Sequence, residues 1–445
     1  MKRVLLLNTP FYRLMGSHYN GLSLGLLYIA SVLRDANHEV GVLNADHEDA
    51  TSYLDQRGIF DGFDTYKRIH EDEGHHIWEG TVRDILAFNP DFLGITMYTA
   101  NFKAARIISQ KVKRENNDIK IVVGGIHPTL ASYETLKAEE FDYVIAGEGE
   151  FPFLKLVNDT PEDRIAGLGY RDGGTPVLYP RGEFIPDLDS LPFPARDLVI
   201  NSSNSTDYGQ LISGRGCPFS CSYCASATIW KRTVRFRSVE NVMKELITIK
   251  ENYPHDVIYF EDDTFTLRPD RTIELCDQII KRGLDIRWKC DTRADCLNDE
   301  MVRFMKRAGC ICIKMGAESG SEKVLKSINK KLTKDIISRA AKTVKKHGIA
   351  LTVYLMAGFP RETDEDLIET INFAKQLDAD YYSLSVVAPY YGTNIYDEYV
   401  RNNGRLGKEH WEYFYHQSQE MIMNDNLSQD IIGEFLSLNE GKKRT

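Results

Sequence analysis

The stretch GRGCPFSCSYC, residues 214–224, constrains the structure and chemistry of this chain more than any other. It places Cys217, Cys221 and Cys224 in a C-x-x-x-C-x-x-C pattern. A disulfide framework would spread its cysteines over the chain, but the first 216 of the 445 residues contain none. Three thiolates on one tight loop can instead bind three irons of a [4Fe–4S] cluster. No His or Cys lies nearby to close a four-ligand zinc site, so the spacing predicts a cluster whose fourth iron is open to a ligand.

The cysteine loop follows the first of a series of candidate strands that alternate with helical patterns. The strands of this series are 209–213, 257–261, 286–290, 311–316, 351–357 and 382–387. Periodic apolar residues predict helices between them, as at 239–250 and 334–346. Six such strands, two fewer than in a closed eight-fold barrel, predict a partial (β/α)6 TIM-type barrel over residues 209–403. Barrel active sites lie at the carboxyl ends of the strands, which is where the cysteine loop falls.

The first part of the chain shows another series of alternating strands and helices. Its candidate strands are 3–7, 39–43, 92–96, 119–124 and 143–146. This alternation predicts a flavodoxin-like, Rossmann-type α/β domain over residues 1–157, and such domains bind ligands beyond the carboxyl ends of their strands. We interpret 46–78 as an irregular insertion or mobile loop, 158–208 as a linker with short strands of its own, and 404–445 as a small helical C-terminal extension.

The composition excludes several classes of partner. A formal net charge of −10 argues against a general nucleic-acid binder, which needs basic surface. The apolar stretches are far too short for a membrane span. The start MKRVLLLNTP lacks the apolar core and cleavage site of a signal peptide, so a cytoplasmic location is expected. The five remaining cysteines lie mostly in apolar patterns and are expected to be buried.

GRGCPFSCSYC resembles the signature of radical S-adenosylmethionine enzymes. Other stretches at predicted strand ends resemble the same family, namely YFEDDTFT at 259–266, CDTRAD at 290–295, GAESGSEKVLKSINK at 316–330, AGFPRET at 357–363 and APYYGTNIY at 388–396. In that family the open iron chelates S-adenosylmethionine, and an electron from the cluster cleaves the sulfonium to give a 5′-deoxyadenosyl radical. The resemblance covers residues 209–403 and implies an external electron donor such as flavodoxin or ferredoxin. Asp262 and Asp263 could equally be helix caps.

The resemblance also implies individual contacts with S-adenosylmethionine. Glu318 would bond its ribose or methionyl part, Arg293 would reach its charged end, and the backbone at Tyr223 would lie beside the adenine. Tyr354, at the end of the fifth barrel strand, is placed in the same set. The residues alone leave alternatives open, because Glu318 could satisfy amides at a helix start and Arg293 could form a surface ion pair.

Two strand ends of the first domain resemble those of cobalamin-binding domains. TMYT at 96–99 and GGIHPT at 124–129 look like the S-x-L…G-G pattern, in which a polar residue and two glycines leave room for the nucleotide tail. AGEGE at 146–150 suits the same edge. The resemblance implies cobalamin contacts at Thr9, Thr96, Tyr98, Thr99, Gly124, Gly125, His127, Thr129, Glu148 and Gly149. Paired glycines after strands are often only turns, so an empty accessory domain is the alternative.

The histidine motif of many cobalamin enzymes is absent from this chain. Mutases and methionine synthase carry D-x-H-x-x-G after the first strand, whereas this loop reads NTPFYRLMGSHYNG. His18 lacks the Asp and Gly frame, and His47 follows the second strand, which is the wrong loop. We therefore expect no histidine on the lower face of cobalt, as is typical of the cobalamin-dependent branch of the radical family.

These features predict a cobalamin-dependent radical S-adenosylmethionine methyltransferase. It would transfer a methyl group from methylcobalamin to an unactivated carbon or a phosphinate phosphorus of a small molecule, with the two sets of strand ends facing each other across one cavity. One alternative is a ring-forming or oxidative enzyme of the anaerobic magnesium-protoporphyrin ester cyclase type, and another is a non-catalytic cobalamin or redox sensor. Methylthiotransferases are set aside because they carry three more cysteines in the first domain. Residues 46–78 and 404–445 are candidate lids.

Overall fold

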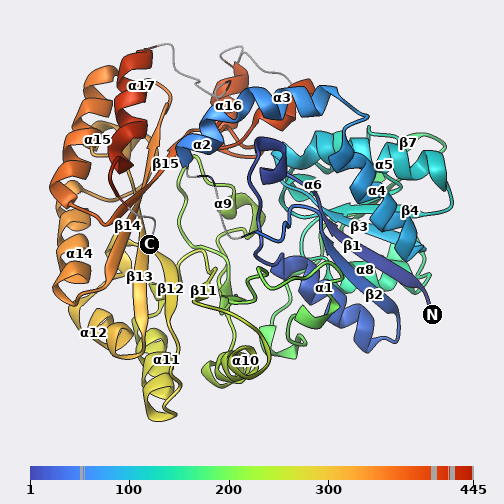
Figure 1. The fold of residues 1–445 in the computed structure, drawn as a ribbon, viewed down its shortest axis with the longest axis horizontal. Coiled ribbons are helices and arrows are strands. Elements are labelled where there is room, and N and C mark those ends of the chain that lie inside the picture. Colours follow the sequence, from blue (N-terminus) through green and yellow to red (C-terminus); the bar gives the residue numbers. More distant parts are fainter. Residues whose placement is uncertain (51–53, 55, 402–407, 419, 421–425, 443–445) are drawn as a thin grey trace. The chain divides into compact units, whose positions relative to one another are not determined.

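The computed structural model describes residues 1–445 except 51–53, 55, 402–407, 419, 421–425 and 443–445 (Figure 1). The chain forms two compact units. Unit 1 comprises Met1–Tyr208 with Leu406–Phe414, and unit 2 comprises Gly209–Arg405 with Tyr415–Thr445. Within the described residues, no helix is long and apolar enough to cross a membrane.

Unit 1 is built on a seven-stranded sheet in the order β2-β1-β3-β4-β5-β6-β7. Its strands are β1 (Arg3–Asn8), β2 (Glu39–Asn44), β3 (Phe92–Thr96), β4 (Lys120–Gly124), β5 (Tyr143–Ile145), β6 (Leu168–Asp172) and β7 (Thr175–Leu178). The first five are parallel, and β6 and β7 extend the edge as antiparallel strands. The order 2-1-3-4-5 of the parallel part is that of flavodoxin-like folds, so the predicted fold of this domain is confirmed.

Amphipathic helices connect the parallel strands of unit 1. They are α1 (Leu24–Asp35), α4 (His76–Phe88), α5 (Phe102–Glu115), the short α6 (Ile126–Leu130) and α7 (Ser132–Thr135), and α8 (Glu150–Val157). The sheet between them is apolar throughout, and residues Val4 to Leu7 of β1 have no exposed surface. A strand that is buried on both faces needs such a continuous apolar run, which explains why β1 lacks alternation.

Residues 46–78 are not the irregular insertion that we predicted. Apart from 51–53 and 55, which lie outside the described residues, they include α2 (Gln56–Asp61), α3 (Phe63–Glu71) and the start of α4. Phe63, Tyr66 and Ile69 of α3 are buried. Their spacing of three residues is one stripe of a helix, which the charged residues between them conceal in the sequence.

Two segments outside the predicted first domain belong structurally to unit 1. Residues 158–208, interpreted as a linker, contribute β6 and β7 to its sheet. The 3-10 helix η8 (Lys408–Tyr413), within the predicted C-terminal extension, places the Trp411 ring 4.8 Å from that of Phe102. Residues 158–208 therefore extend the sheet of unit 1, and η8 packs against helix α5 of the same unit.

Unit 2 has a six-stranded parallel sheet in the order β15-β14-β13-β12-β11-β8. Its strands are β8 (Gln210–Leu211), β11 (Ile258–Phe260), β12 (Trp288–Arg293), β13 (Cys310–Glu318), β14 (Ala350–Ala357) and β15 (Tyr381–Val386). The helices that alternate with them are α10 (Val239–Asn252), α11 (Pro269–Lys281), α12 (Asp299–Arg307), α14 (Lys334–Lys346) and α15 (Asp364–Leu377) (green to orange in Figure 1). This is the predicted partial (β/α)6 barrel, and α17 (Gln429–Leu436) supplies the helical C-terminal segment.

Candidate functional site

The cysteine loop lies between β9 (Gly214–Arg215) and the short helix α9 (Ser226–Ile229). Gly216 precedes it with a φ of +101°, and a Cβ there would lie 2.1 Å from the carbonyl oxygen of Thr233. Only glycine fits this left-handed turn against the neighbouring backbone. The turn leaves the three cysteines of the loop partly exposed and free of disulfides.

The three thiols fit a cluster better than a single ion. Burial raises the pKa of Cys224 to about 12. The Cys224 backbone nitrogen donates to the Cys221 carbonyl at 3.2 Å, which holds these two residues in one turn. Yet among the described residues no three His, Cys, Asp or Glu side chains gather as the ligands of one metal ion would. In a [4Fe–4S] cluster each thiolate binds a different iron, which requires thiols that are close but spread apart.

Two carboxylates after β11 hold both flanks of the cysteine loop. Ser213 donates to Asp262 from its backbone nitrogen and from its hydroxyl, each at 2.6 Å. The Ser226 hydroxyl donates to Asp263 at 3.0 Å. The interpretation of these two aspartates as helix caps is wrong, because Thr264 precedes the following 3-10 helix.

Glu318, at the carboxyl end of β13, forms a buried ion pair with Lys330. The Lys330 Nζ lies 2.7 Å from Glu318 Oε1, and the two side chains are 4% and 8% exposed, respectively. Glu318 has a φ of +69°, beside a register shift between β13 and β14, and this left-handed conformation costs a non-glycine residue about 1–2 kcal/mol. A Cβ at Gly316 would lie 2.5 Å from Glu318 Oε1, so the pair needs the space that glycine leaves. Backbone strain at a buried carboxylate is typical of a functional position.

Lys330 connects this ion pair to the cysteine loop, and sequence reasoning missed it. Its Nζ lies 3.2 Å from the Tyr223 hydroxyl, and its carbonyl accepts from Arg293 Nη2 at 2.9 Å. Burial and then the Glu318 carboxylate raise the pKa of Tyr223 well above its usual value, so the phenol stays neutral. Only the turn that follows α13 (Glu322–Ser327) brings residue 330 back to residue 318.

Arg293 is directed at the cysteine loop. Its Nη1 donates to Cys221 Sγ at 3.6 Å, and its guanidinium carbon lies 3.7 Å from the centroid of the Phe219 ring. Nε donates to Asp295 at 3.0 Å. Burial raises the pKa of the adjacent Cys296 thiol to about 12. The contact of Arg293 with the charged end of S-adenosylmethionine stays a prediction.

Tyr354 belongs to a polar group inside the barrel. Its hydroxyl donates to Asp291 Oδ1 at 2.7 Å, and Tyr259 donates to Oδ2. Because β13 separates β12 from β14 in the sheet, the first bond crosses the concave face. Asp291, Tyr354 and Lys314 stay partly exposed. The neighbours on these strands that pack in the apolar core are Cys290, Met315, Val353 and Leu355. The interior of the barrel is therefore polar and accessible.

In unit 1, the predicted cobalamin glycines lie at the carboxyl end of β4. Gly125 has a φ of +99°, and a Cβ there would lie 2.9 Å from Thr96 Oγ1. A Cβ at Gly124 would meet only the Ile145 carbonyl oxygen, at 3.6 Å. Gly125 thus shapes the turn, whereas Gly124 leaves space beside the strand ends. Tyr98, after β3, is 56% exposed.

Other predicted cobalamin residues join the loops after β4 and β5. The Thr129 hydroxyl donates to the Gly125 carbonyl at 2.7 Å and accepts from the Gly147 backbone nitrogen at 2.9 Å. Glu148 accepts from the backbone nitrogen of Ile185 at 2.8 Å. A Cβ at Gly149 would lie 3.0 Å from the Ile29 side chain. These residues hold the shape of this edge.

Three predicted cobalamin residues are buried beneath the edge. Thr9 and His127 are 0% exposed and Thr99 is 3% exposed. The Thr9 hydroxyl accepts from Asn101 at 2.7 Å, and His127 Nδ1 lies 3.1 Å from Thr99 Oγ1. Burial lowers the pKa of His127 to about 3, so its ring is neutral, and it packs against Trp411. The structure gives these side chains a packing role and almost no exposed surface, and their contact with cobalamin stays a prediction.

The loops that carry His18 and His47 are tied together by a buried aspartate. Asp46 accepts from the backbone nitrogens of Phe11 and Arg13, each at 2.9 Å. His47 Nε2 lies 3.0 Å from the Thr206 hydroxyl, and burial lowers its pKa. His18 is 5% exposed. The loop after β1 is thus held against β2 by Asp46.

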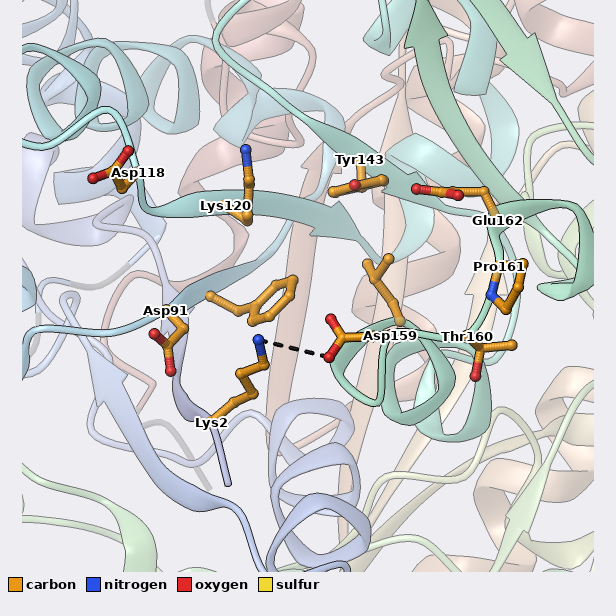
Figure 2. A pocket seen from close by; sticks show the side chains of 11 residues that line it. Lys2, Asp91, Asp118, Lys120, Tyr143, Asp159, Thr160, Pro161 and Glu162 are labelled. Carbon is orange, nitrogen blue, oxygen red and sulfur yellow. Dashed lines mark ion pairs between the residues drawn. The ribbon is translucent and has the colours of Figure 1, made fainter.

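A pocket of about 380 Å³ lies at the amino ends of the strands of the same sheet, opposite the carboxyl ends described above (Figure 2). Lys2 and Asp159 pair beside it at 3.7 Å, and Lys120 and Tyr143 line it from the amino ends of β4 and β5. Doubly wound sheets bind ligands at their carboxyl ends, so this pocket is not the candidate site.

The chain matches two protein families. The Radical SAM superfamily matches residues 211–374, and the B12 binding domain family matches residues 17–157. An uncharacterized methyltransferase of Pyrococcus horikoshii is 33% identical over 391 residues, which cover 86% of this chain and 79% of that protein.

An anaerobic magnesium-protoporphyrin IX monomethyl ester cyclase of Rubrivivax gelatinosus is 30% identical over 340 residues, covering 72% of this chain and 60% of that protein. Among solved structures, the radical S-adenosylmethionine methyltransferase TsrM of Kitasatospora setae matches with a TM-score of 0.70 and 18% identity. That match covers 90% of this chain and 76% of TsrM. At this identity the likeness concerns the fold.

Proposed function

Because this chain belongs to the cobalamin-dependent radical S-adenosylmethionine enzymes, we propose that it transfers a methyl group to an unactivated carbon or a phosphinate phosphorus of a small molecule. Its cofactors are a [4Fe–4S] cluster, S-adenosylmethionine and cobalamin. When bound, they supply the radical and the methyl group, and the protein supplies binding, orientation and exclusion of water.

The observation that carries the proposal is the buried Lys330–Glu318 pair beside the cysteine loop. One carboxylate, one ammonium and the neutral Tyr223 phenol converge there, at the carboxyl end of a barrel strand. This set can bind the amino, carboxyl and hydroxyl groups of S-adenosylmethionine, and the three loop cysteines can bind a cluster beside it. The individual contacts are proposals.

The barrel interior supports a polar substrate. Asp291 uses one lone pair on each oxygen for a tyrosine hydroxyl and keeps others for a donor. Burial raises the pKa of Tyr259 and of Tyr354, so both phenols stay protonated and orient the carboxylate. A hydroxyl or ammonium group of the substrate would find its acceptor here. That the cobalamin edge of unit 1 faces this interior stays a prediction.

The test is anaerobic incubation of the reconstituted protein with S-adenosylmethionine and dithionite. A radical enzyme produces 5′-deoxyadenosine, whereas a cobalamin or redox sensor produces none. Mass spectrometry of extracts from cells with and without the gene should then reveal metabolites that differ by one methylene group. Absence of 5′-deoxyadenosine from protein that holds both cluster and cobalamin would overturn the proposal.

The cyclase relative is the reason to keep a second candidate. A ring-forming reaction changes the hydrogen or oxygen content of its substrate without adding a methylene group, so the same mass measurement separates the two. Transfer of a labelled methyl group from S-adenosylmethionine to the product would exclude the cyclase. A cytoplasmic location and an external electron carrier belong to the proposal in either case.

A further inference from the structure

A basic segment that follows the cysteine loop in the chain holds the loop in place. Arg232 Nε donates to the carbonyl of Pro218 at 3.1 Å, directly beside Cys217 in the chain. The neighbouring Thr233 carbonyl is the atom against which Gly216 packs. Residues 230–233 therefore lie on the backbone of the loop itself, with Lys231, Arg232 and Thr233 exposed.

A second basic segment, which follows β13 in the chain, also contacts the cysteine loop. The Asn329 side chain donates to the Ser220 carbonyl at 2.8 Å, and the Ser222 backbone nitrogen donates to the Ile328 carbonyl at 2.9 Å. Lys326 and Lys331 flank these contacts, and both are exposed. The partly exposed cysteine loop is thus bordered by cations from two separate elements.

These four cations, Lys231, Arg232, Lys326 and Lys331, form what we call the basic rim. Within the described part of the chain, none of them forms an ion pair, although the protein as a whole has a net charge of −10. Lys231, Arg232 and Lys331 have φ values of +48°, +60° and +57°. Non-glycine residues adopt this conformation at a cost of about 1–2 kcal/mol each, so the turns that present these side chains are set by the contacts with the loop.

We propose that the basic rim is the docking surface for an acidic one-electron carrier protein. The cluster accepts one electron and the reduced carrier loses one, so no atom is transferred. A net negative protein and an acidic carrier repel each other at long range, and a local group of cations overcomes this repulsion and orients the encounter. The rim offers such a group on exposed segments that bond directly to the backbone of the loop that holds the cluster.

The charge-reversal variants that test the proposal are Lys231→Glu with Arg232→Glu, and Lys326→Glu with Lys331→Glu. The matched control is Lys244→Glu with Lys342→Glu, an equal charge change at exposed lysines of α10 and α14. Binding of a purified acidic flavodoxin is measured at several salt concentrations. Reduction of the cluster is followed by stopped-flow absorbance, with flavodoxin hydroquinone and separately with dithionite.

Each rim variant should weaken flavodoxin binding and slow reduction by flavodoxin at least tenfold at low salt. The salt dependence should become shallower, while at high salt, where charge effects on the small dithionite anion are screened, dithionite reduces all variants at the wild-type rate. Equal effects of rim and control variants would overturn the proposal, because they would reflect net charge alone. Wild-type protein that binds no flavodoxin and no acidic ferredoxin would overturn it too. Reduction is measured without a substrate, so failure of methyl transfer leaves this test intact.

Discussion

Replacing Lys330 by Met tests the ion pair on which the proposed S-adenosylmethionine site depends. Methionine keeps much of the apolar volume of the lysine stem and removes the charge. Removing one partner of a buried pair costs about 3–5 kcal/mol, because the other charge stays buried without compensation. The Glu318 and Lys330 side chains are both under 10% exposed, so this range applies. A unit the size of unit 2 loses about 2–4 °C in Tm per kcal/mol, which gives a decrease of roughly 6–20 °C.

The assay is calorimetry of the cofactor-free protein, following the transition of unit 2. A chain of two units does not unfold in one step, so the Tm of that transition is compared rather than a global free energy. The double variant Lys330→Met with Glu318→Gln removes both charges and should recover most of the loss. In the reconstituted protein, either variant should weaken equilibrium binding of S-adenosylmethionine at least tenfold.

Two results would refute this reasoning. A decrease of less than about 2 °C for Lys330→Met would mean that the pair is solvated despite its burial. A double variant that is less stable than the single variant would mean that Glu318 is not destabilised by losing its partner. The variant could also show the expected loss of Tm while its affinity for S-adenosylmethionine is unchanged. The pair would then have only a structural role and would not belong to the proposed site.

Further predictions concern the cluster, the cobalamin edge and one buried acid. Replacing the three loop cysteines by Ala should abolish the broad iron–sulfur absorption, and a variant that still binds about four irons would contradict the assignment. Gly124→Phe should block cobalamin binding measured by absorption while Gly124→Ala retains it, since a Cβ there meets only an atom 3.6 Å away. Electron paramagnetic resonance of the cob(II)alamin form should show no nitrogen splitting; splitting lost on changing His18 or His47 would refute this. Burial raises the pKa of Glu362 from 4.5 to about 7, so its stabilising contribution is complete below pH 4.5 and is lost as the pH rises through 7. The shift in pKa corresponds to about 3 kcal/mol of folding free energy. Glu362→Gln should remove this pH dependence of thermal unfolding.

The sequence alone was enough to predict the two folds and the cluster loop, because these depend on local patterns. Apolar runs and helical stripes determine which segments become strands and helices, and three cysteines on one short loop are neighbours whatever surrounds them. It failed at 46–78, where the helical stripe of Phe63, Tyr66 and Ile69 is broken by charges that face solvent. Recognising such a helix requires knowing that a neighbouring surface buries one of its faces.

The pairing and exposure of individual side chains were decided only by the tertiary structure. Lys330 meets Glu318 because the turn after α13 brings the chain back to the end of β13, and Tyr354 meets Asp291 because strand order and register bring together residues that are distant in the chain. The same reason explains His127, which follows a predicted ligand-binding strand end but is fully buried against Trp411, almost three hundred residues later. A residue's position in the sequence indicates the strand end to which it belongs. Whether its side chain contacts a ligand or the core depends on which distant segments pack beside it.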